Sequence, residues 1–509
     1  MPPTPDTPPE SPPPRHTQRR PFPWWIIISA LVGLLTAEAA AALHVYLSNR
    51  NLHRTVTAIS DAGYLAVPNE HIIPTLLSFK TALYGGIFYT LSVGAALVTL
   101  SLVMAWAWDR FFHRDRRTLV SPILLWAACL IGANHQGFAP LATVHFLVIP
   151  PVVFGLAVFL MPPRRPADRR NREWLIHPVA LILLAALGAS QMEAEVFSRF
   201  RNRCLLDNPV GLAVNDFYYR YTLYAARTFK SLDQRLMNAC HVETDSPHLA
   251  RRIESRLARY DYLAVGDRHA ADLRIDARQD VIRLQSGDAP ILRIPRRQFF
   301  SETRKHLEDF SQKTDRHGFL RGFTFVCLIG QSLVILYVFF SIPVQLALRP
   351  FLSPFRAKAA AAAVCLLICW SFFQFLQPQP LPDIGKALAS DDPMQQAAAL
   401  KIVTDEKLEI ADFPSYAHLL DSPHIAVRYR LARALGVSRS PRTYPPLLSL
   451  LEDDSFTVVY QTYWGLGRRG RREAIPRIKA GIAASDHWYV QTYAYKALRR
   501  LGWKQTASD

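Results

Sequence analysis

The sequence lacks most of the residue patterns that mark common enzyme classes. Its 509 residues include only 6 cysteines, with no CxxC pair and no zinc-site spacing. The motifs HExxH and GxSxG and the Walker A phosphate loop are also missing. We therefore predict no cofactor and no metal, and we favour a binding or scaffolding role over catalysis.

Acidic residues are scarce relative to basic ones. The chain has 41 Asp and Glu against 59 Lys and Arg, which gives a formal net charge of +18. Such an excess can indicate nucleic-acid binding. Here much of it lies in short runs beside apolar segments, where anionic lipid headgroups are the natural counterions. We expect membrane lipid as a partner and no nucleic acid.

Hydrophobic residues, by contrast, make up 50% of the chain and are clustered. Seven segments approach or exceed the ~20 apolar residues with which a helix crosses a ~30 Å hydrocarbon core. Lipid offers the backbone no hydrogen-bond partners, so these segments must be helical. The predicted spans are 24–47, 83–108, 119–138, 142–161, 174–189, 319–346 and 357–376.

Basic residues in the short loops predict the orientation of the spans. Clusters of Lys and Arg precede the first span and join spans two and three, four and five, and six and seven. These clusters share one side of a seven-span chain, and the positive-inside rule places that side in the cytoplasm. We expect a bacterial inner-membrane protein with a cytoplasmic N-terminus and with its soluble parts in the periplasm.

The first span has a second interpretation. Its basic approach and the small residues Ala37, Ala39 and Ala41 also fit a cleaved signal peptide. The span is long for the apolar region of a signal, which favours an uncleaved anchor. The rest of the topology is the same under both interpretations.

Between the fifth and sixth spans lies a soluble insert of the size of a small domain. Its first part is helical in pattern and rich in tyrosine. Residues 273–276, 281–284 and 291–294 then alternate apolar and charged side chains, with turn residues between them, which is the period of half-buried strands. We predict a small α+β domain outside the membrane.

The C-terminal segment repeats at intervals of about thirty residues. An acidic turn at Asp421 is followed by Val427-Arg428 and then by Ala434-Leu435-Gly436, and a similar order returns after Asp453 and Asp486. Each unit fits two short helices, which must stack on the next unit to bury their apolar faces. The pattern predicts a small α-solenoid.

These units resemble HEAT-like repeats of the short, phycobilisome-lyase type. The second unit departs from that pattern with Val459 in place of arginine and Gly465 in place of alanine, and the third has Gln491 in place of arginine. The resemblance covers about a quarter of the chain and implies a protein-binding or scaffolding surface. It does not imply chromophore attachment, and the membrane region resembles no family.

The predicted fold class is mostly α: a polytopic helical membrane protein with a small α+β extracytoplasmic insert and a C-terminal HEAT-like α-solenoid. The predicted divisions are a disordered proline-rich tail (1–23), a five-span membrane domain (24–190), the insert (191–318), a two-span hairpin (319–377) and the repeat domain (378–509).

One candidate site consists of ionisable side chains in the outer parts of the spans, where such groups usually have a use. From the helix rise per residue, His44, His135 and His145 lie at a similar depth in the membrane. There they would hold haem or a metal or relay protons. Alternatively, they simply face water or headgroups. The residues are Glu38, His44, His135 and His145.

Three further groups have both a functional and an ordinary interpretation. Cys204 and Cys240 are the two cysteines outside the spans, which predicts a disulfide, or else two free buried thiols. A tyrosine cluster around Tyr219 suits either a recognition patch or a core. A basic turn would contact an acidic partner or lipid headgroups, or would be a solvated loop; its residues are Arg468, Arg469, Arg471 and Arg472.

Two functions remain open at this point. The leading one is an integral membrane scaffold or adaptor that presents the repeat domain and the insert to a protein partner at the cell envelope. The alternative is a membrane enzyme, or a redox or transport component, built around the histidines and Glu38. A Soret band or stoichiometric metal in the purified protein would indicate the alternative.

The orientation of the spans leads to a direct prediction. A reporter that is active only in the periplasm, fused after Asp509, should be active, because the basic clusters place the opposite side of the chain in the cytoplasm. If a cytoplasm-only reporter works at this position instead, one span has been assigned wrongly, and the short segment 174–189 is the first suspect.

Overall fold

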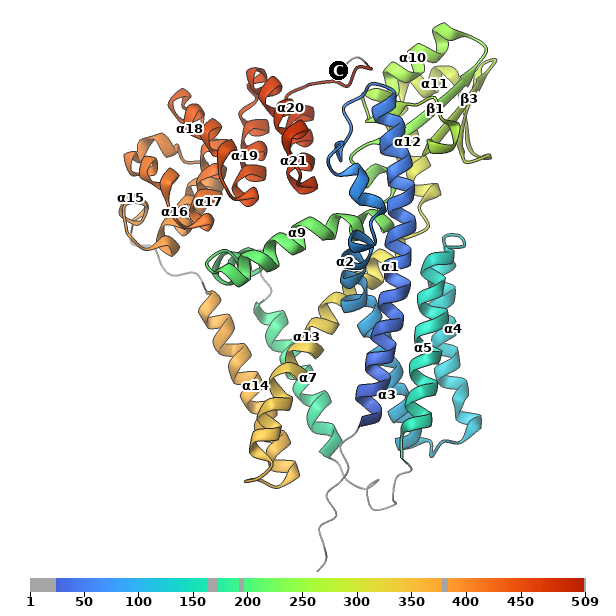
Figure 1. Ribbon diagram of the computed structural model, residues 1–509, viewed down its shortest axis with the longest axis vertical. Helices are drawn as coiled ribbons and strands as arrows, with labels where there is room; N and C mark the ends of the chain where they lie inside the picture. The colour runs from blue at the N-terminus through green and yellow to red at the C-terminus, as the bar shows by residue number, and fades with distance from the viewer. Residues whose placement is uncertain (1–23, 163–172, 192–195, 378–382, 508–509) are drawn as a thin grey trace, which may run out of the picture.

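The computed structural model describes residues 24–162, 173–191, 196–377 and 383–507. Long helices run along the molecule in its lower half, and two compact parts sit above them in Figure 1. One of these parts is the insert with its sheet, and the other is the C-terminal repeat domain. The described chain is mostly helical, with one small sheet, as the sequence predicted.

Within the described ranges, seven helices are long and apolar enough to cross a membrane, by length and composition alone. They correspond to the seven predicted segments. A π-helical turn, Thr90–Gly94, joins two helices into the second rod. The helices are α1 (Trp24–Asp61), α2 (Phe79–Tyr89) with α3 (Ala95–Phe111), α4 (Val120–Asn134), α5 (Pro140–Leu160), α7 (Ile176–Gln191), α13 (Gly318–Leu348) and α14 (Pro354–Leu376).

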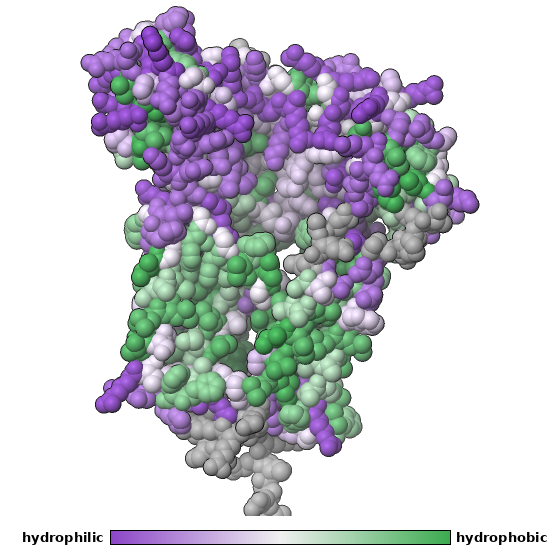
Figure 2. All heavy atoms as spheres, turned by 180° about the vertical axis from the view of Figure 1, so that it is seen from behind, coloured by the Kyte–Doolittle hydropathy of each residue, from purple (hydrophilic) through white to green (hydrophobic). Residues whose placement is uncertain are grey.

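The outer surface of these helices is apolar. Phe159 on α5 is 83% exposed and Leu35 on α1 is 71% exposed, which is unusual for large hydrophobic side chains in water. Figure 2 shows this hydrophobic surface along the lower half of the molecule and a hydrophilic surface above it. The boundary between the two surfaces separates the long helices from the insert and the repeat domain.

Helix α1 is the central element of the first group of helices and packs against α2, α3 and α5. Small residues make this close packing possible: a Cβ added to Gly86 on α2 would lie 2.9 Å from the backbone nitrogen of Ala42 on α1. A second group consists of α7, α13 and α14, with Leu184 and Cys365 in its core. The turns α3–α4 and α13–α14 lie at the lower end, opposite the insert and the repeat domain (Figure 1).

The insert contains a five-stranded sheet in the order β2-β1-β3-β4-β5. Strand β1 is parallel to β2 and β3, while β3, β4 and β5 form an antiparallel meander. The meander confirms the three predicted strands, but β1 and β2 were not predicted. The elements are β1 (Asn238–Thr244), α10 (Pro247–Ala258), β2 (Tyr262–Ala264), β3 (Leu273–Arg278), β4 (Val281–Ser286), β5 (Ala289–Pro295), α11 (Arg296–Ser301) and α12 (Thr303–Thr314).

Two helices lead from α7 into the insert. They are α8 (Val196–Phe200), continued by the π-helical turn Arg201–Leu205, and α9 (Pro209–Phe229). Asn208 caps α9 by accepting a hydrogen bond from the Gly211 amide, at 2.7 Å. Helix α9 crosses above the long helices and beneath the repeat domain (Figure 1), so it contacts both α2 and the last helix of the chain.

The repeat domain is built of helix pairs, as predicted. Helices α16, α17, α19 and α21 each contact the next, and shorter helices lie between them. The repeated leucines Leu435, Leu466 and Leu498 are 0% exposed, so the predicted register is confirmed. The helices are α15 (Ile384–Leu388), α16 (Pro393–Asp405), α17 (Ile425–Val437), α18 (Tyr444–Ser449), α19 (Phe456–Arg469), α20 (Ile475–Ala484) and α21 (Trp488–Arg500).

Two details explain how consecutive units fit together. Arg428 of one unit forms an ion pair with Asp453 at the start of the next, with Nε and Oδ2 2.6 Å apart and both side chains largely buried. Gly465, which stands where the repeat pattern has alanine, lies directly against Gly436: a Cβ added to Gly436 would be 2.5 Å from the Cα of Gly465. The departure at Gly465 thus allows α19 to approach α17 closely.

We expect Leu435→Asp to unfold the repeat domain while leaving the long helices intact. Burying a leucine contributes roughly 1.5–3 kcal/mol, and an unpaired buried carboxylate costs more than that. Limited proteolysis of membrane vesicles should therefore release fragments of the repeat domain faster than in the wild type. Met394→Asp on α16, where the side chain is 38% exposed, is the matched control and should behave like the wild type. Equal digestion of both variants would contradict a core position for Leu435.

Candidate interaction site on the repeat domain

The connection between α1 and α2 fastens the repeat domain to the long helices. The Asn69 side chain donates hydrogen bonds from Nδ2 to the carbonyl oxygens of Ile482, Ala483 and Ser485, at 2.9–3.0 Å. These carbonyls are at the C-terminal end of α20, where a helix has no internal partners for them. Asn69 therefore caps a helix more than 400 positions away in the chain.

Two glutamines of the last repeat complete this attachment. The Asn69 backbone amide donates to Oε1 of Gln491 at 2.9 Å. Gln505 makes a reciprocal pair with Leu65, accepting from its amide at 3.0 Å and donating to its carbonyl at 2.8 Å. Gln491 stands where the repeat pattern has arginine, so this departure from the pattern coincides with a contact to the rest of the protein.

Aromatic side chains on α9 form the second part of the attachment. The Tyr219 ring lies 4.6 Å from that of Tyr489 on α21, and the Tyr224 ring lies 5.1 Å from that of Trp488. Tyr219 and Tyr224 are buried, whereas Tyr218 is 40% exposed. The predicted tyrosine cluster is therefore largely a core between α9 and the repeat domain. Tyr218 remains exposed, and Tyr221 is half-buried.

Arg201 joins the same contact from the turn after α8. Its guanidinium lies over the Tyr429 ring, 4.3 Å from the centroid, and Nη1 donates to the Tyr460 hydroxyl at 3.2 Å. The side chain is only 6% exposed. Tyr429 and Tyr460 belong to α17 and α19, so one arginine holds two consecutive repeats against the base of the domain.

The opposite ends of α17 and α19 form an open groove with a volume of about 730 Å³. Its charged side chains are basic with one exception, the carboxylate of Glu409. Three of the four arginines predicted as an interaction surface line it, while Arg472 does not. The cations of the groove are Lys407, Arg439, Arg468, Arg469 and Arg471.

Glu409 and Arg469 are engaged in holding the groove together. Glu409 accepts hydrogen bonds from the Ser438 hydroxyl and from the Arg439 amide, the latter at 2.7 Å. Burial alone would raise the pKa of Glu409, but these hydrogen bonds outweigh it and lower the pKa below its usual value. Arg469 donates to the Ser440 carbonyl at 2.7 Å. Glu409 therefore stays ionised at neutral pH and is already paired with donors of the groove wall.

Two other arginines of the groove, Arg468 and Arg471, lie against aromatic rings. The Arg468 guanidinium is 5.4 Å from the ring centroid of Trp464, and Arg471 is 4.4 Å from that of Tyr444. Arg433 covers Trp464 from α17, at 5.1 Å. Arginine, tryptophan and tyrosine are the residue types that contribute most at protein–protein interfaces. These rings support the guanidinium groups from behind, and the surface that the groove itself offers is positively charged.

The segment Gly465–Gly470 has the spacing G-x-G-x-x-G of a dinucleotide-binding loop. That motif requires a turn between a strand and the start of a helix, where free amides point at the phosphates. Here the segment is the end of α19, and Gly470 is its C-cap with φ of 72°. The spacing therefore reflects close helix packing and a helix terminus rather than a nucleotide site.

The structure brings together only two of the four ionisable residues predicted within the spans. The rings of His44 and His145 lie 5.7 Å apart, where α1 meets α5. His135 instead lies beside Phe319, and an oxygen of Glu38 faces Gly86 on α2. Among the described residues, no group of three or more His, Cys, Asp or Glu is placed to hold a metal ion.

The predicted disulfide is absent from the structure, in which both cysteines are free. Cys240 is 0% exposed in the central strand β1 and belongs to the core of the sheet. Cys204 lies in the π-helical turn after α8, which packs against α9. The prediction was wrong because it relied on both residues being outside the spans, which says nothing about their separation in the fold.

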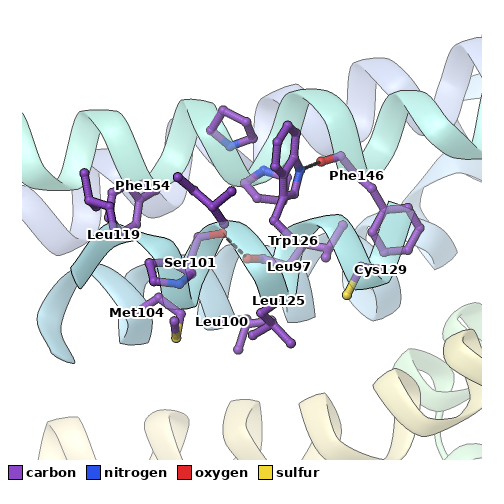
Figure 3. A pocket seen from close by; sticks show the side chains of 14 residues that line it. Leu97, Leu100, Ser101, Met104, Leu119, Leu125, Trp126, Cys129, Phe146 and Phe154 are labelled. Carbon is purple, nitrogen blue, oxygen red and sulfur yellow. Dashed lines mark hydrogen bonds between the residues drawn. The ribbon is translucent and has the colours of Figure 1, made fainter. Parts of the chain in front are cut away.

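An apolar cavity of about 330 Å³ lies between α3, α4 and α5 (Figure 3). Its shape depends on a proline pair in α5. Pro150 has no N–H, which leaves the Phe146 carbonyl without its helical partner, and the Trp126 indole on α4 donates to that oxygen at 2.6 Å. Ser101 at the cavity wall bonds to its own helix at Leu97. The cavity therefore offers hydrocarbon surface and suits an apolar occupant.

Comparison with known proteins identifies one region. Residues 415–499 match the family model of HEAT repeats. No curated protein and no solved structure matches the chain. The C-terminal units are therefore HEAT repeats, as their sequence pattern indicated, and domains of this kind generally mediate contacts between proteins.

We expect Tyr219→Ala to loosen the contact between α9 and the repeat domain, because truncating a buried aromatic side chain costs roughly 3–5 kcal/mol. Hydrogen exchange followed by mass spectrometry should show faster exchange in α9 and in the first turns of α19 and α21. Tyr218→Ala removes the neighbouring, more exposed ring and serves as the control, with little change expected. If both variants exchange alike, the aromatic contact does not hold the domain.

Proposed function

We propose that this protein is an integral membrane scaffold or adaptor of the cell envelope, which holds a protein partner on its HEAT repeats. The observation that carries the proposal is the open basic groove at the C-terminal ends of α17 and α19. Its arginines suit an acidic segment of a partner protein. The HEAT repeats themselves belong to a class that binds proteins.

Membrane insertion is supported by the surface of the long helices. Side chains such as Phe159 and Leu35 would be costly to expose to water, but they suit contact with lipid. The turns that carry Arg116, Arg117 and Lys358 lie at the end opposite the soluble parts (Figure 1). Under the positive-inside rule this arrangement corresponds to a cytoplasmic N-terminus in a plasma membrane, with the insert and the repeat domain in the periplasm.

The packing of α1 favours the uncleaved anchor. Ala37 and Ala41 are 0% exposed, and the helix continues without a break to Asp61. Cleavage near Ala41 would remove half of the central element of the first helix group. We infer that the first span stays in the mature protein.

The attachment of the repeat domain gives the scaffold a defined geometry. The starts of α19 and α21 face α9, and the ends of α17 and α19 carry the groove. A helix of 14 residues is about 21 Å long, so the groove opens roughly that far from the base of the domain. A bound partner would be held at a fixed height above the membrane.

The alternative function, a membrane enzyme or a redox or transport component, has less support. It relied on a shared site of Glu38 with three histidines, of which only His44 and His145 come close together. Two imidazoles in contact also fit ordinary packing between α1 and α5. We therefore retain the scaffold as the proposed function.

The groove can be tested by site-specific crosslinking in cells. With a photo-crosslinking amino acid in place of Arg439, a discrete adduct with a partner protein is expected. The double variant Arg468→Glu, Arg471→Glu should reduce the yield of this adduct by at least about tenfold. Placing like charges opposite each other at an interface costs several kcal/mol. The partner identified by mass spectrometry should then bind the purified protein, and the binding should weaken with added salt.

Arg472→Glu provides the matched control, since this residue is in the same turn, is exposed and lies outside the groove. It changes the net charge in the same direction and should leave the adduct in place. If the adduct persists in the double variant, or if Arg472→Glu abolishes it equally, the groove is not the binding surface.

A further inference from the structure

A second basic site lies beneath the repeat domain, between it, the insert and the outer ends of the spans. Two cavities of about 380 and 470 Å³ adjoin there. They share Leu52 and Thr55 of α1, Arg227 at the end of α9, and Arg235 in the segment after it. We call the two cavities together the junction chamber.

Basic side chains outnumber acidic ones along its walls, and the acidic ones are already engaged. Asp272 is paired with Arg235 at 2.7 Å, and Asp261 with Arg499 at 3.0 Å. Asp233 accepts a hydrogen bond from the Ser231 hydroxyl at 2.6 Å and from that of Ser311 at 2.5 Å. The carboxylates of the chamber therefore leave other cations without a counter-charge.

Arg227 and Lys230 are the deepest of these cations. Both are half-buried, because they face the hollow, and among the described residues neither makes an ion pair or a side-chain hydrogen bond. Burial, together with the nearby Arg235, lowers the pKa of Arg227 from its usual value. Burial and the neighbouring Arg227, Lys496 and Arg235 lower the pKa of Lys230 to about 8. The fold thus holds like charges together at a cost in stability.

More cations surround the mouth of the chamber: Arg54 from α1, Arg316 after α12, and Lys496 and Arg500 from α21. These four side chains are exposed. They come from elements that are far apart in the sequence, so the concentration of charge is a product of the fold. A cleft lined by one sign of charge attracts a ligand of the opposite sign.

We propose that the junction chamber binds a phosphate-bearing anion through Arg227 and Lys230. Phosphate oxygens accept the forked donors of arginine and the ammonium group of lysine, and their charge would relieve the repulsion between these side chains. The lower wall of the chamber includes His44 and Leu47 of α1 and Leu141 of α5, which are in the outer parts of two spans. A lipid phosphate can therefore reach it from the bilayer, a route that rests on the proposed membrane insertion, whereas a soluble phosphate can enter from the periplasmic side.

The first experiment measures thermal unfolding of the delipidated full-length protein in detergent. Inorganic pyrophosphate should raise Tm by several degrees relative to chloride at equal ionic strength, since a ligand of the folded state stabilises it. In the double variant Arg227→Met, Lys230→Met this shift should vanish, while Tm without ligand stays equal or rises because the repulsion has been removed. Arg251→Gln removes an exposed charge on α10, outside the chamber, and should keep the full shift.

The second experiment separates the two sources of phosphate. Native mass spectrometry of protein released from nanodiscs should detect retained phosphatidylglycerol, in preference to phosphatidylcholine, if a lipid headgroup is the ligand. That retention should be lost in the Arg227→Met, Lys230→Met variant. A pyrophosphate shift without lipid retention assigns the chamber to a soluble phosphate instead. Neither a shift nor retention, or an equal shift in the double variant, would overturn the proposal.

The pH dependence provides a check that needs no variant. Short-chain phosphatidylglycerol is a phosphate diester with constant charge between pH 7 and 9.5. Lys230, with its pKa of about 8, loses its proton in the empty chamber over this range, whereas the guanidinium of Arg227 keeps its charge. Affinity should therefore fall on the order of tenfold from pH 7 to 9.5, since binding requires the charged forms. Binding at ordinary surface cations would not weaken, and a flat profile would contradict the assignment.

The charged groups that face this pair from neighbouring elements are Asp233, Arg235, Asp261, Asp272, Lys496 and Arg499. The groove variant Arg468→Glu, Arg471→Glu should leave the pyrophosphate shift unchanged. Failure of the chamber experiment and failure of the proposed scaffold function can thus be told apart.

Discussion

The contact between the repeat domain and the base formed by α9 and the α1–α2 connection determines the arrangement of the molecule. HEAT units alone specify a stack of helices, without a direction relative to the long helices. Asn69 supplies that direction because its side chain takes up the three terminal carbonyls of α20. The aromatic rings around Tyr219 add buried area beside it. One helix cap and one aromatic core thus orient the domain.

The same contact creates the junction chamber and keeps it separate from the groove. Because the starts of α19 and α21 are fixed on α9, the opposite ends of α17 and α19 remain open and form the groove. Because α21 is held above the end of α9, Lys496 and Arg499 come to face Arg227 and form a wall of the junction chamber. A repeat domain on a flexible tether would have the groove but would lack the chamber.

The net charge of +18 thus has distinct physical roles in different places. Basic turns at one end of the long helices would face the cytoplasmic headgroups in the proposed membrane topology. The groove presents a positive surface whose arginines lie against Trp464 and Tyr444, which suits the acidic partner of the proposed function. The chamber holds cations that repel one another, which is unfavourable unless an anion is present. The overall charge, taken by itself, does not distinguish these roles.

Local pattern was sufficient to predict much of the fold. The seven apolar segments, the three strands of the meander and the buried positions of Leu435, Leu466 and Leu498 all depend on residues close in sequence. Strand β1 was not predicted although Cys240, His241, Val242 and Glu243 alternate apolar and polar residues, and β2 has only three residues, whose strand form depends on pairing with β1. The Cys204–Cys240 pairing was wrong for a related reason, since it required a distance between remote segments that no local pattern contains.

By itself, the sequence determined which segments are apolar helices, where the repeats lie and which of their faces are buried, because hydrophobic periodicity acts over a few turns. It also singled out three arginines of the groove as a basic turn. Only the tertiary structure decided that Asn69 caps α20, that Gln491 replaces an arginine at a docking contact, and that Arg227 and Lys230 share a hollow with Lys496. These features join side chains hundreds of positions apart, and their energies depend on distance in space rather than along the chain.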